Sequence, residues 1–232
     1  MRRYTEQQVR RTILKYETRH SAVNLDGAPI DILEIVDAYD LLDRLLEQEE
    51  SNSARPVRFP YWAEIWPASV ALSSWLLKSD LQLPTRGGVK ELGCGLGLVG
   101  VALARSGVQV EATDFVEDAL VFATHNARRN GASLLHRVSY LDWSHPVGSP
   151  SPCLIGSDVT YEKQSHQYLY RTIRKLLAPG GRLLLSDPRR PVARPFFSSL
   201  KQAGFAHAVA SETVQWKSIS HEVDIHLFTR PA

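Results

Sequence analysis

A glycine-rich turn between a short apolar strand and a helix limits the folds open to this chain. Residues 89–100 read Val-Lys-Glu-Leu-Gly-Cys-Gly-Leu-Gly-Leu-Val-Gly. Gly93, Gly95 and Gly97 let the backbone pass directly beneath a bound ligand, where any Cβ atom would collide with it. The apolar run from Leu98 begins a helix whose first N–H groups are free and point at the same place. The sequence therefore predicts a site for a nucleotide-like ligand at this turn.

The glycines fit two motifs. Gly95-x-Gly97-x-x-Gly100 satisfies the fingerprint of dinucleotide-binding folds, which hold a pyrophosphate on the helix N-terminus. The other register, Glu91-x-Gly93-x-Gly95-x-Gly97, is the motif of S-adenosylmethionine-dependent methyltransferases. That cofactor is a cation with a free ammonium group, so a carboxylate attracts it. The same carboxylate would repel the negatively charged diphosphate of a dinucleotide. The acid at the head of the motif therefore favours S-adenosylmethionine as the cofactor, with Glu91 among its contacts.

A second acid follows at the spacing that such folds use. Val108 begins a predicted strand that ends at Asp114, 21 positions after Gly93. Nucleotide-binding α/β folds place a carboxylate that binds the ribose about 20 residues after the turn. Phe115 is expected to lie against the adenine face. A helix N-cap is the alternative role for Asp114, and the two roles are compatible.

Composition excludes several classes of protein. The chain has 232 residues, 44% of them apolar, and a net charge of +2, which is too small to indicate a nucleic-acid partner. No apolar run approaches the ~20 residues that a membrane helix requires. Cys94 and Cys153 do not form a metal-type spacing, so we expect no metal site and a reducing, cytoplasmic environment. We also expect a monomer.

From residue 60 onward, predicted strands and helices alternate, which is typical of a parallel sheet with helices on both faces. The predicted strands span residues 89–92, 108–113, 137–141, 153–157, 181–186, 206–215 and 221–229. The predicted helices span residues 68–77, 98–106, 117–130, 163–178 and 193–203. The expected fold is an α/β, Rossmann-like, doubly wound seven-stranded sheet, mostly parallel, with a C-terminal antiparallel hairpin. Seven-stranded methyltransferases have such a hairpin and dinucleotide dehydrogenases lack it.

Residues 1–58 are expected to form an N-terminal helical and strand extension packed on the core, and residues 59–232 the domain that binds S-adenosylmethionine. The predicted elements of the extension are a helix at 5–20, a half-exposed strand at 30–35, an amphipathic helix at 40–50 and a polar loop at 51–56. The buried stripe of the amphipathic helix is predicted to comprise Leu41, Leu42, Leu45 and Leu46.

Four stretches of the chain resemble the seven-stranded protein methyltransferases called family 16. They are residues 60–67 (Pro-Tyr-Trp-Ala-Glu-Ile-Trp-Pro), the glycine turn at 91–97, residues 141–143 (Leu-Asp-Trp) and residues 157–161 (Ser-Asp-Val-Thr-Tyr). The resemblance covers roughly residues 57–230. It is strongest to the branch with lysine methyltransferases of the electron-transfer flavoprotein β subunit. It implies a methyltransferase that modifies a side-chain nitrogen of a protein substrate, with lysine as the expected acceptor.

The resemblance implies further cofactor contacts. Trp66 is expected to line the methionine end of the pocket, where an aromatic face attracts the sulfonium. Asp142 and Trp143 are expected beside the adenine, with the carboxylate accepting from the exocyclic amine and the indole packing on the ring. Ser157 is expected to contact the cofactor through its backbone. Core packing is the alternative for each tryptophan. For Trp62, a place in the core and a place at the rim of the substrate site are both open.

Asp158 and Tyr161 are the expected catalytic residues, at the sheet edge that faces the transferred methyl group. Methyl transfer needs a nitrogen lone pair held about 3 Å from the methyl carbon. A lysine arrives as an ammonium with an ordinary pKa of about 10.4, so the site must favour loss of its proton. Asp158 is expected to orient the amine, and Tyr161 to aim the lone pair or narrow the pocket. The alternative for Asp158 is a helix N-cap.

Other functions stay open. Asp-Val-Thr-Tyr in place of Asn-Pro-Pro-Tyr at residues 158–161 argues against nucleobase substrates. A small-molecule amine or a protein histidine remains a possible acceptor, and a cofactor-binding interaction module without turnover and a nicotinamide oxidoreductase are further alternatives. The flavoprotein branch has Asp-Pro-Gly-Arg where this chain has Asp187-Pro-Arg189-Arg190. These arginines form either a solvated turn or a surface that favours an acidic substrate, which leaves the protein substrate open.

Two groups of polar residues are given structural interpretations. His221, Glu222, Asp224 and His226 are possible metal ligands, but an exposed sheet edge explains them better. His125 and Asn126 are expected to be surface and packing residues of their helix.

Overall fold

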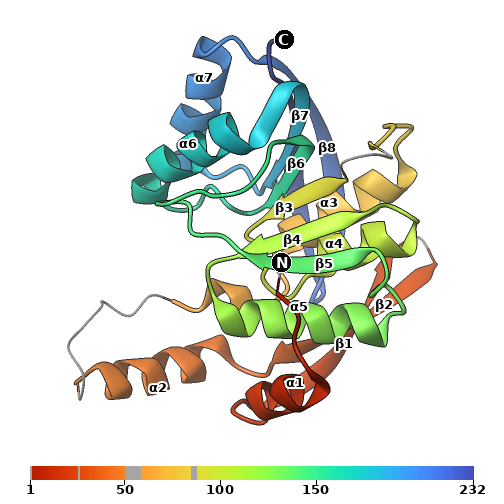
Figure 1. Ribbon diagram of the computed structural model, residues 1–232, viewed down its shortest axis with the longest axis vertical. Helices are drawn as coiled ribbons and strands as arrows, with labels where there is room; N and C mark the ends of the chain where they lie inside the picture. The colour runs from red at the N-terminus through yellow and green to blue at the C-terminus, as the bar shows by residue number, and fades with distance from the viewer. Residues whose placement is uncertain (1, 26, 51–58, 85–87) are drawn as a thin grey trace.

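The computed structural model describes residues 2–25, 27–50, 59–84 and 88–232, so the polar loop predicted at 51–56 lies outside the described residues. At its centre is a seven-stranded sheet with the order β5-β4-β3-β6-β7-β9-β8 (Figure 1). The strands are β3 (Val89–Leu92), β4 (Val110–Asp114), β5 (His136–Tyr140), β6 (Ser151–Ser157), β7 (Leu177–Asp187), β8 (Ala206–Trp216) and β9 (Ile219–Thr229).

The strands from β3 to β7 pair in parallel, whereas β9 is antiparallel to both β7 and β8. The predicted doubly wound sheet with an antiparallel C-terminal hairpin is therefore confirmed. The strand order reverses beside β3, because β4 lies on one side of it and β6 on the other. Such a reversal opens a crevice at the carboxyl ends of the strands, where ligands bind in folds of this kind.

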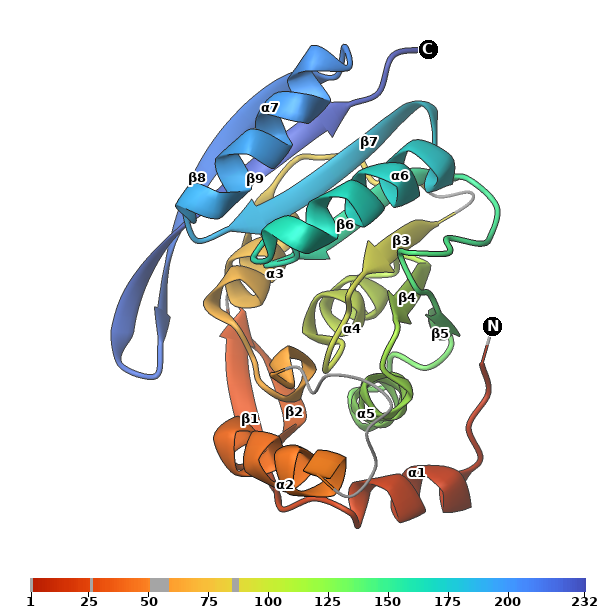
Figure 2. The same ribbon diagram turned by 90° about the vertical axis from the view of Figure 1, so that its left-hand side faces the viewer.

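Helices cover both faces of the sheet (Figure 2). One face carries α3 (Pro67–Lys78), α4 (Leu98–Arg105) and α5 (Glu117–Arg129), and the other carries α6 (His166–Leu176) and α7 (Arg194–Gln202). Short 3₁₀ turns span Tyr61–Ala63, Lys163–Ser165 and Pro191–Ala193. Pro67 is the first residue of α3, where its missing N–H costs nothing. The predicted helices agree with these bounds to within a few residues.

The N-terminal extension differs from its prediction. It consists of α1 (Glu6–Ile13), β1 (Thr18–Leu25), β2 (Ala28–Ile35) and α2 (Ala38–Glu50), and β1 and β2 form a separate antiparallel hairpin. The helix predicted over residues 5–20 is therefore wrong beyond Ile13. Its last residues form the hairpin because Val23 and Leu25 bury their side chains in the core shared with α3, α4 and α5. Leu46 is 44% exposed, so the buried stripe of α2 is narrower than expected.

Asn126 of α5 fastens the β1–β2 hairpin to the main sheet. Its side chain is fully buried, with 0% exposure. Its Oδ1 accepts a hydrogen bond from the Leu33 N–H at 2.8 Å, and its Nδ2 donates to the carbonyl oxygens of Leu33 at 3.2 Å and Leu96 at 2.9 Å. One helical turn later, Asn130 makes the same kind of pair with the backbone of Asp31. A helix thus meets the backbone hydrogen-bonding needs of the β2 edge.

Across the described ranges, no helix has both the length and the apolar character needed to traverse a bilayer.

Candidate functional site

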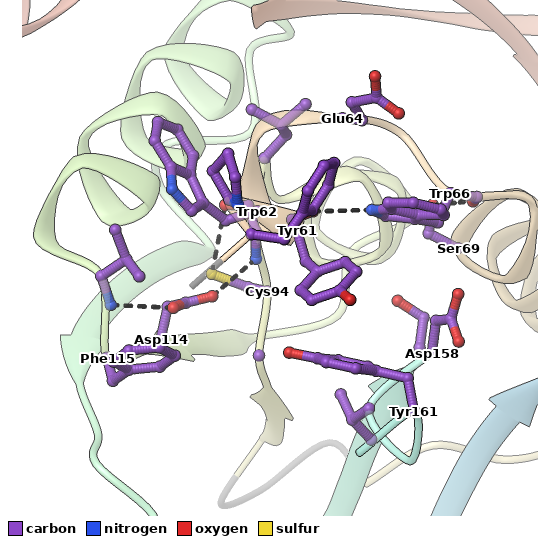
Figure 3. A pocket seen from close by; sticks show the side chains of 18 of the residues that line it. Tyr61, Trp62, Glu64, Trp66, Ser69, Cys94, Asp114, Phe115, Asp158 and Tyr161 are labelled. Atoms are coloured by element: carbon purple, nitrogen blue, oxygen red, sulfur yellow. Dashed lines mark hydrogen bonds between the residues drawn. The ribbon is translucent and has the colours of Figure 1, made fainter. Parts of the chain in front are cut away.

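A cavity of about 830 Å³ opens at the carboxyl ends of the central strands. Ten of the twelve site residues predicted from the sequence line it: Trp66, Gly93, Gly95, Asp114, Phe115, Asp142, Trp143, Ser157, Asp158 and Tyr161. Figure 3 shows Tyr61 and Trp66 on one side of this cavity, and Tyr161 and Asp158 on the other. Residues that lie far apart in the sequence are therefore brought to one place.

The glycine turn is shaped as the sequence predicts. Gly93 and Gly95 have φ angles of 65° and 50°, in the left-handed region that favours glycine. A Cβ atom on Gly93 would lie 3.1 Å from Val159 Cγ1, and one on Gly95 would lie 3.3 Å from the Trp62 carbonyl oxygen. The turn is therefore closely packed against other residues that line the same cavity.

Gly97 does not line the cavity. Its φ is 84°, and a Cβ atom there would lie 2.9 Å from the Cβ of Ala123 on α5. This glycine allows α4 to begin in close contact with α5, and its expected contact with a ligand stays a prediction.

Glu91 does not lie among the residues that line the cavity, so its expected contact with a cofactor stays a prediction. Its side chain is 1% exposed, and a Cβ atom on Gly100 would lie 2.7 Å from Glu91 Oε2 and 2.8 Å from His136 Nε2. Glu91 therefore turns behind α4 toward His136. Burial raises the pKa of Glu91 to about 8, against a lowering effect of the Gly100 amide. The carboxylate was expected to face a positively charged ligand, and its position does not support that argument.

Asp114 supports the glycine turn and lines the cavity. Its Oδ2 accepts a hydrogen bond from the Gly95 N–H and its Oδ1 accepts one from the Val116 N–H, each at 3.0 Å (Figure 3). Burial raises the pKa of Asp114, and these backbone hydrogen bonds oppose the rise. Val116 is the N-cap of α5, so the alternative role of Asp114 as that cap is not what the structure has. Phe115 beside it is 52% exposed, with its ring free to cover a ligand.

Aromatic rings form the opposite end of the cavity. The Trp66 indole N–H donates to the Tyr61 carbonyl oxygen at 2.7 Å. The Tyr61 and Tyr161 rings contact each other, with 4.4 Å between their centroids, and burial raises the pKa of Tyr161. Trp62 packs edge-on against Phe122 and also lines the cavity, so it contacts the core, and its place at a substrate rim stays a prediction. Tyr61 was given no role from the sequence, although it lies in the stretch 60–67.

Asp158 lies in an unusual backbone conformation at the end of β6. Its φ is 51°, which is rare for a residue other than glycine, and its N–H donates to the Ser186 carbonyl oxygen at 2.9 Å. Both carboxylate oxygens accept hydrogen bonds from Arg190, at 2.9 Å and 2.8 Å. The next 3₁₀ turn has Glu162 as its N-cap and α6 has Ser165, so Asp158 does not cap the following helix.

The two arginines after β7 have separate partners. Arg190 lines the cavity and binds Asp158, whereas Arg189 binds Glu222 and Asp224 on β9. Both guanidinium groups have acidic partners within the chain, and whether they favour an acidic substrate stays open. His226 stacks on Phe197 and contacts His207. Among the residues that the structure describes, no group of His, Cys, Asp and Glu is arranged to hold a metal ion.

The N-terminal extension supplies part of the cavity wall, which the sequence did not indicate. Leu41 and Leu45 of α2 line it, together with Tyr16, whose hydroxyl donates to Asp118 Oδ2 at 2.5 Å. No motif marks these positions, because they reach the cavity only through tertiary packing, in which Tyr16 lies edge-on against Phe122 of α5.

The cavity suits a nucleoside-bearing ligand. The glycine turn gives close backbone approach at one wall, and Asp114 and Asp142 present carboxylates at the ends of neighbouring strands. Trp143 lies beneath the same turn, with its ring 3.5 Å from the position of a Cβ atom on Gly93. An aromatic surface, acidic groups and a tight turn are therefore all present where a base and a ribose need them.

Comparison with known proteins agrees with this reading of the site. A family model described as lysine methyltransferase matches residues 61–203. The protein N-lysine methyltransferase METTL21A of Danio rerio is 33% identical over 53% of this chain and 59% of its own length. Its counterpart in Mus musculus is 30% identical over 72% of this chain and 75% of its own length. The electron transfer flavoprotein beta subunit lysine methyltransferase of Mus musculus is 30% identical over 59% of this chain, and the match spans 53% of that protein.

Solved structures share the fold. Magnesium protoporphyrin IX methyltransferase from Synechocystis PCC 6803, with bound SAM, aligns with a TM-score of 0.55 at 18% identity, over 84% of this chain and 98% of the other. The N-methyltransferase NodS from Bradyrhizobium japonicum aligns with a TM-score of 0.54 at 17% identity, over 82% and 98% of the two chains. At these identities the likeness concerns the fold alone.

Proposed function

The chain belongs to the lysine methyltransferase family, and on this basis we propose that it transfers a methyl group from S-adenosylmethionine to a side-chain nitrogen of a protein, with lysine as the acceptor. One observation carries the proposal. The glycine turn and the Asp158–Tyr161 loop, from different strands, line one cavity. We assign the methyl donor to the glycine turn and the acceptor nitrogen to the Asp158–Tyr161 loop within this one cavity.

The donor end of the cavity comprises Gly93, Gly95, Asp114, Phe115 and Asp142. We propose that Asp114 binds the ribose and that Phe115 and Trp143 enclose the adenine. Trp66 and the backbone of Ser157 then contact the methionine portion. S-adenosylmethionine, when bound, supplies a methyl group activated by its sulfonium.

The acceptor end comprises Tyr61, Trp66, Asp158 and Tyr161. Asp158 accepts a hydrogen bond from the incoming nitrogen, and the two tyrosine rings enclose the aliphatic part of its side chain. The nitrogen must lose one proton before it can use its lone pair, and water takes that proton. The surroundings of Asp158 thus orient the nucleophile. Orientation of the reacting atoms contributes much of the rate of such a transfer.

Replacing Asp158 by alanine is expected to lower the rate of methyl transfer about 100-fold, because the acceptor nitrogen loses its fixed partner. The assay incubates the full chain with labelled S-adenosylmethionine and a lysate that lacks its own copy of the protein. Mass spectrometry then locates the labelled residue. Calorimetric titration with S-adenosylmethionine checks that the variant still binds its cofactor. The control is Asp43→Ala, at an exposed position on α2.

The same experiment separates the alternatives. Label on histidine, or on small molecules only, would favour the other acceptors, and cofactor binding without any label would favour an interaction module. Binding of NAD in place of S-adenosylmethionine would contradict the proposal altogether. We also propose a cytoplasmic location, which the two buried, free cysteines support.

A further inference from the structure

Two loops at the acceptor end are linked by a closed set of polar contacts. The first follows β6 and carries Asp158 and Thr160, and the second begins at Asp187, the last residue of β7, and carries Arg190. Thr160 Oγ1 donates to Asp187 Oδ2 at 2.9 Å, and the Arg190 N–H donates to Asp187 Oδ1 at 2.7 Å. Asp187 is 1% exposed, so it is a buried bridge between the loops.

The Arg190–Asp158 pair completes this set inside the cavity. The side chain of Asp158 is only 7% exposed, whereas that of Arg190 is 36% exposed. Arg190 uses Nε and Nη2 on separate carboxylate oxygens, a geometry that holds a carboxylate in one plane. Each oxygen has a further lone pair, so the carboxylate can still accept a hydrogen bond from a substrate.

Asp158 needs such a partner because of its backbone. A φ of 51° carries an energetic cost for a residue with a Cβ atom, and such conformations persist only where the surroundings enforce them. The backbone N–H of Asp158 donates to the Ser186 carbonyl oxygen, which fixes the main chain at this residue. The orientation of the Asp158 carboxylate is then fixed by its hydrogen bonds with Arg190. Tyr61, Tyr161 and Asp187 are the other titratable groups around the pair.

We propose that Arg190 is a positioning residue for methyl transfer, which fixes the Asp158 carboxylate in the orientation that receives the acceptor nitrogen. This inference rests on the proposed function. Arg190 acts through Asp158 and exchanges no proton with the substrate. The neighbouring Arg189 has no such role, because its guanidinium binds Glu222 and Asp224 on the outer side of β9.

The test compares three variants in the labelling assay. Arg190→Ala is expected to lower kcat about 50-fold with little change in the KM for S-adenosylmethionine, since the donor end is untouched. Added methylguanidinium is expected to restore at least a tenth of the lost rate by occupying the vacated space. The kcat of Arg190→Lys is expected to lie between those of the unaltered chain and Arg190→Ala, because an ammonium cannot make the bidentate contact. Arg189→Gly is the matched control, and a glycine suits its φ of 60°.

Readouts without turnover complete the test. Calorimetry should show unchanged S-adenosylmethionine affinity, and a crystal structure of Arg190→Ala should show the Asp158 carboxylate rotated from its place. Full activity in Arg190→Ala, an unmoved carboxylate, or equal losses in Arg190→Ala and Arg189→Gly would overturn the inference. If the unaltered chain labels no protein, the proposed function fails and this inference falls with it. Should Arg190→Ala fail to fold, Arg190→Lys carries the comparison.

Discussion

Replacing Asn126 by alanine is expected to lower the free energy of unfolding by about 3 kcal/mol. The substitution removes three hydrogen bonds and leaves the N–H and carbonyl of Leu33 and the carbonyl of Leu96 buried without a partner. Buried backbone groups without partners are costly because water cannot replace the lost contact. Denaturant unfolding measures the total effect. Hydrogen exchange at the Leu33 amide, which donates directly to Asn126, should accelerate most.

The matched control is His125→Ala, one position earlier on α5. His125 is half-buried and makes no side-chain hydrogen bond within the described part of the chain. It should change stability by less than about 1 kcal/mol. If the two variants lose equal stability, or if exchange at Leu33 stays slow in Asn126→Ala, then the Asn126 hydrogen bonds do not hold the β1–β2 hairpin.

Stability is expected to fall as the pH rises from 6.5 toward 9, and Glu91→Gln is expected to remove that fall. Unfolded Glu91 loses its proton near its ordinary pKa of 4.5, whereas the folded protein keeps that proton to about pH 8. The unfolded state therefore binds fewer protons between these values, and stability decreases with pH. The loss above pH 6.5 amounts to about 2 kcal/mol.

His136 works in the opposite direction at lower pH. Burial lowers the pKa of His136 from 6.5 to about 4, so the unfolded state binds the additional proton between these values and stability rises with pH. The two contributions offset each other between pH 4.5 and 6.5, which leaves Glu91 as the main contributor between pH 6.5 and 8. Toward pH 9 the raised pKa values of the buried Cys94 and Cys153 thiols add a loss of the same sign. Nearby Asp114 adds to the rise in the pKa of Glu91.

Denaturant unfolding at pH 6.5 and pH 9 decides the matter. The unaltered chain and the control Glu47→Gln, at an exposed position of α2, should both lose stability across this interval. Glu91→Gln should lose much less. If the free energy of unfolding falls equally with pH in all three proteins, Glu91 is already ionised in the folded state. His136 would then have to carry the compensating proton.

The main sheet was predictable because its strands are short apolar runs separated by glycines and helix-forming stretches. Each strand from β3 to β9 was placed within a few residues of its observed bounds. The N-terminal extension was less predictable. Thr18 to Leu25 carries charged and apolar residues that suit a helix or a strand, and only pairing with β2 decides between them. Long-range pairing of this kind leaves no local pattern in the sequence.

In the site, too, some features follow from local sequence and others depend on tertiary contacts. Glycine turns and acids at strand ends mark positions that the fold brings to the crevice, so most of the expected residues line it. The direction of a side chain is harder to predict. Glu91 occupies a strand in which alternate side chains face opposite sides of the sheet, and it faces His136 where the charge argument expected a ligand. Arg189 is the departure from the Asp-Pro-Gly-Arg pattern, whereas Arg190 matches that pattern, and the contact of Arg190 with Asp158 depends on two loops meeting in space.

The cavity wall built by Tyr16, Leu41 and Leu45 has a consequence for substrate choice. These residues precede residue 61, where the match to the family model begins. The family model therefore covers the residues that line the cavity from Tyr61 onward and does not cover this wall. Under the proposed function, replacing the first 47 residues by those of another family member is the direct way to change which substrate the protein accepts. The replaced segment would change the shape of the cavity while leaving the glycine turn intact.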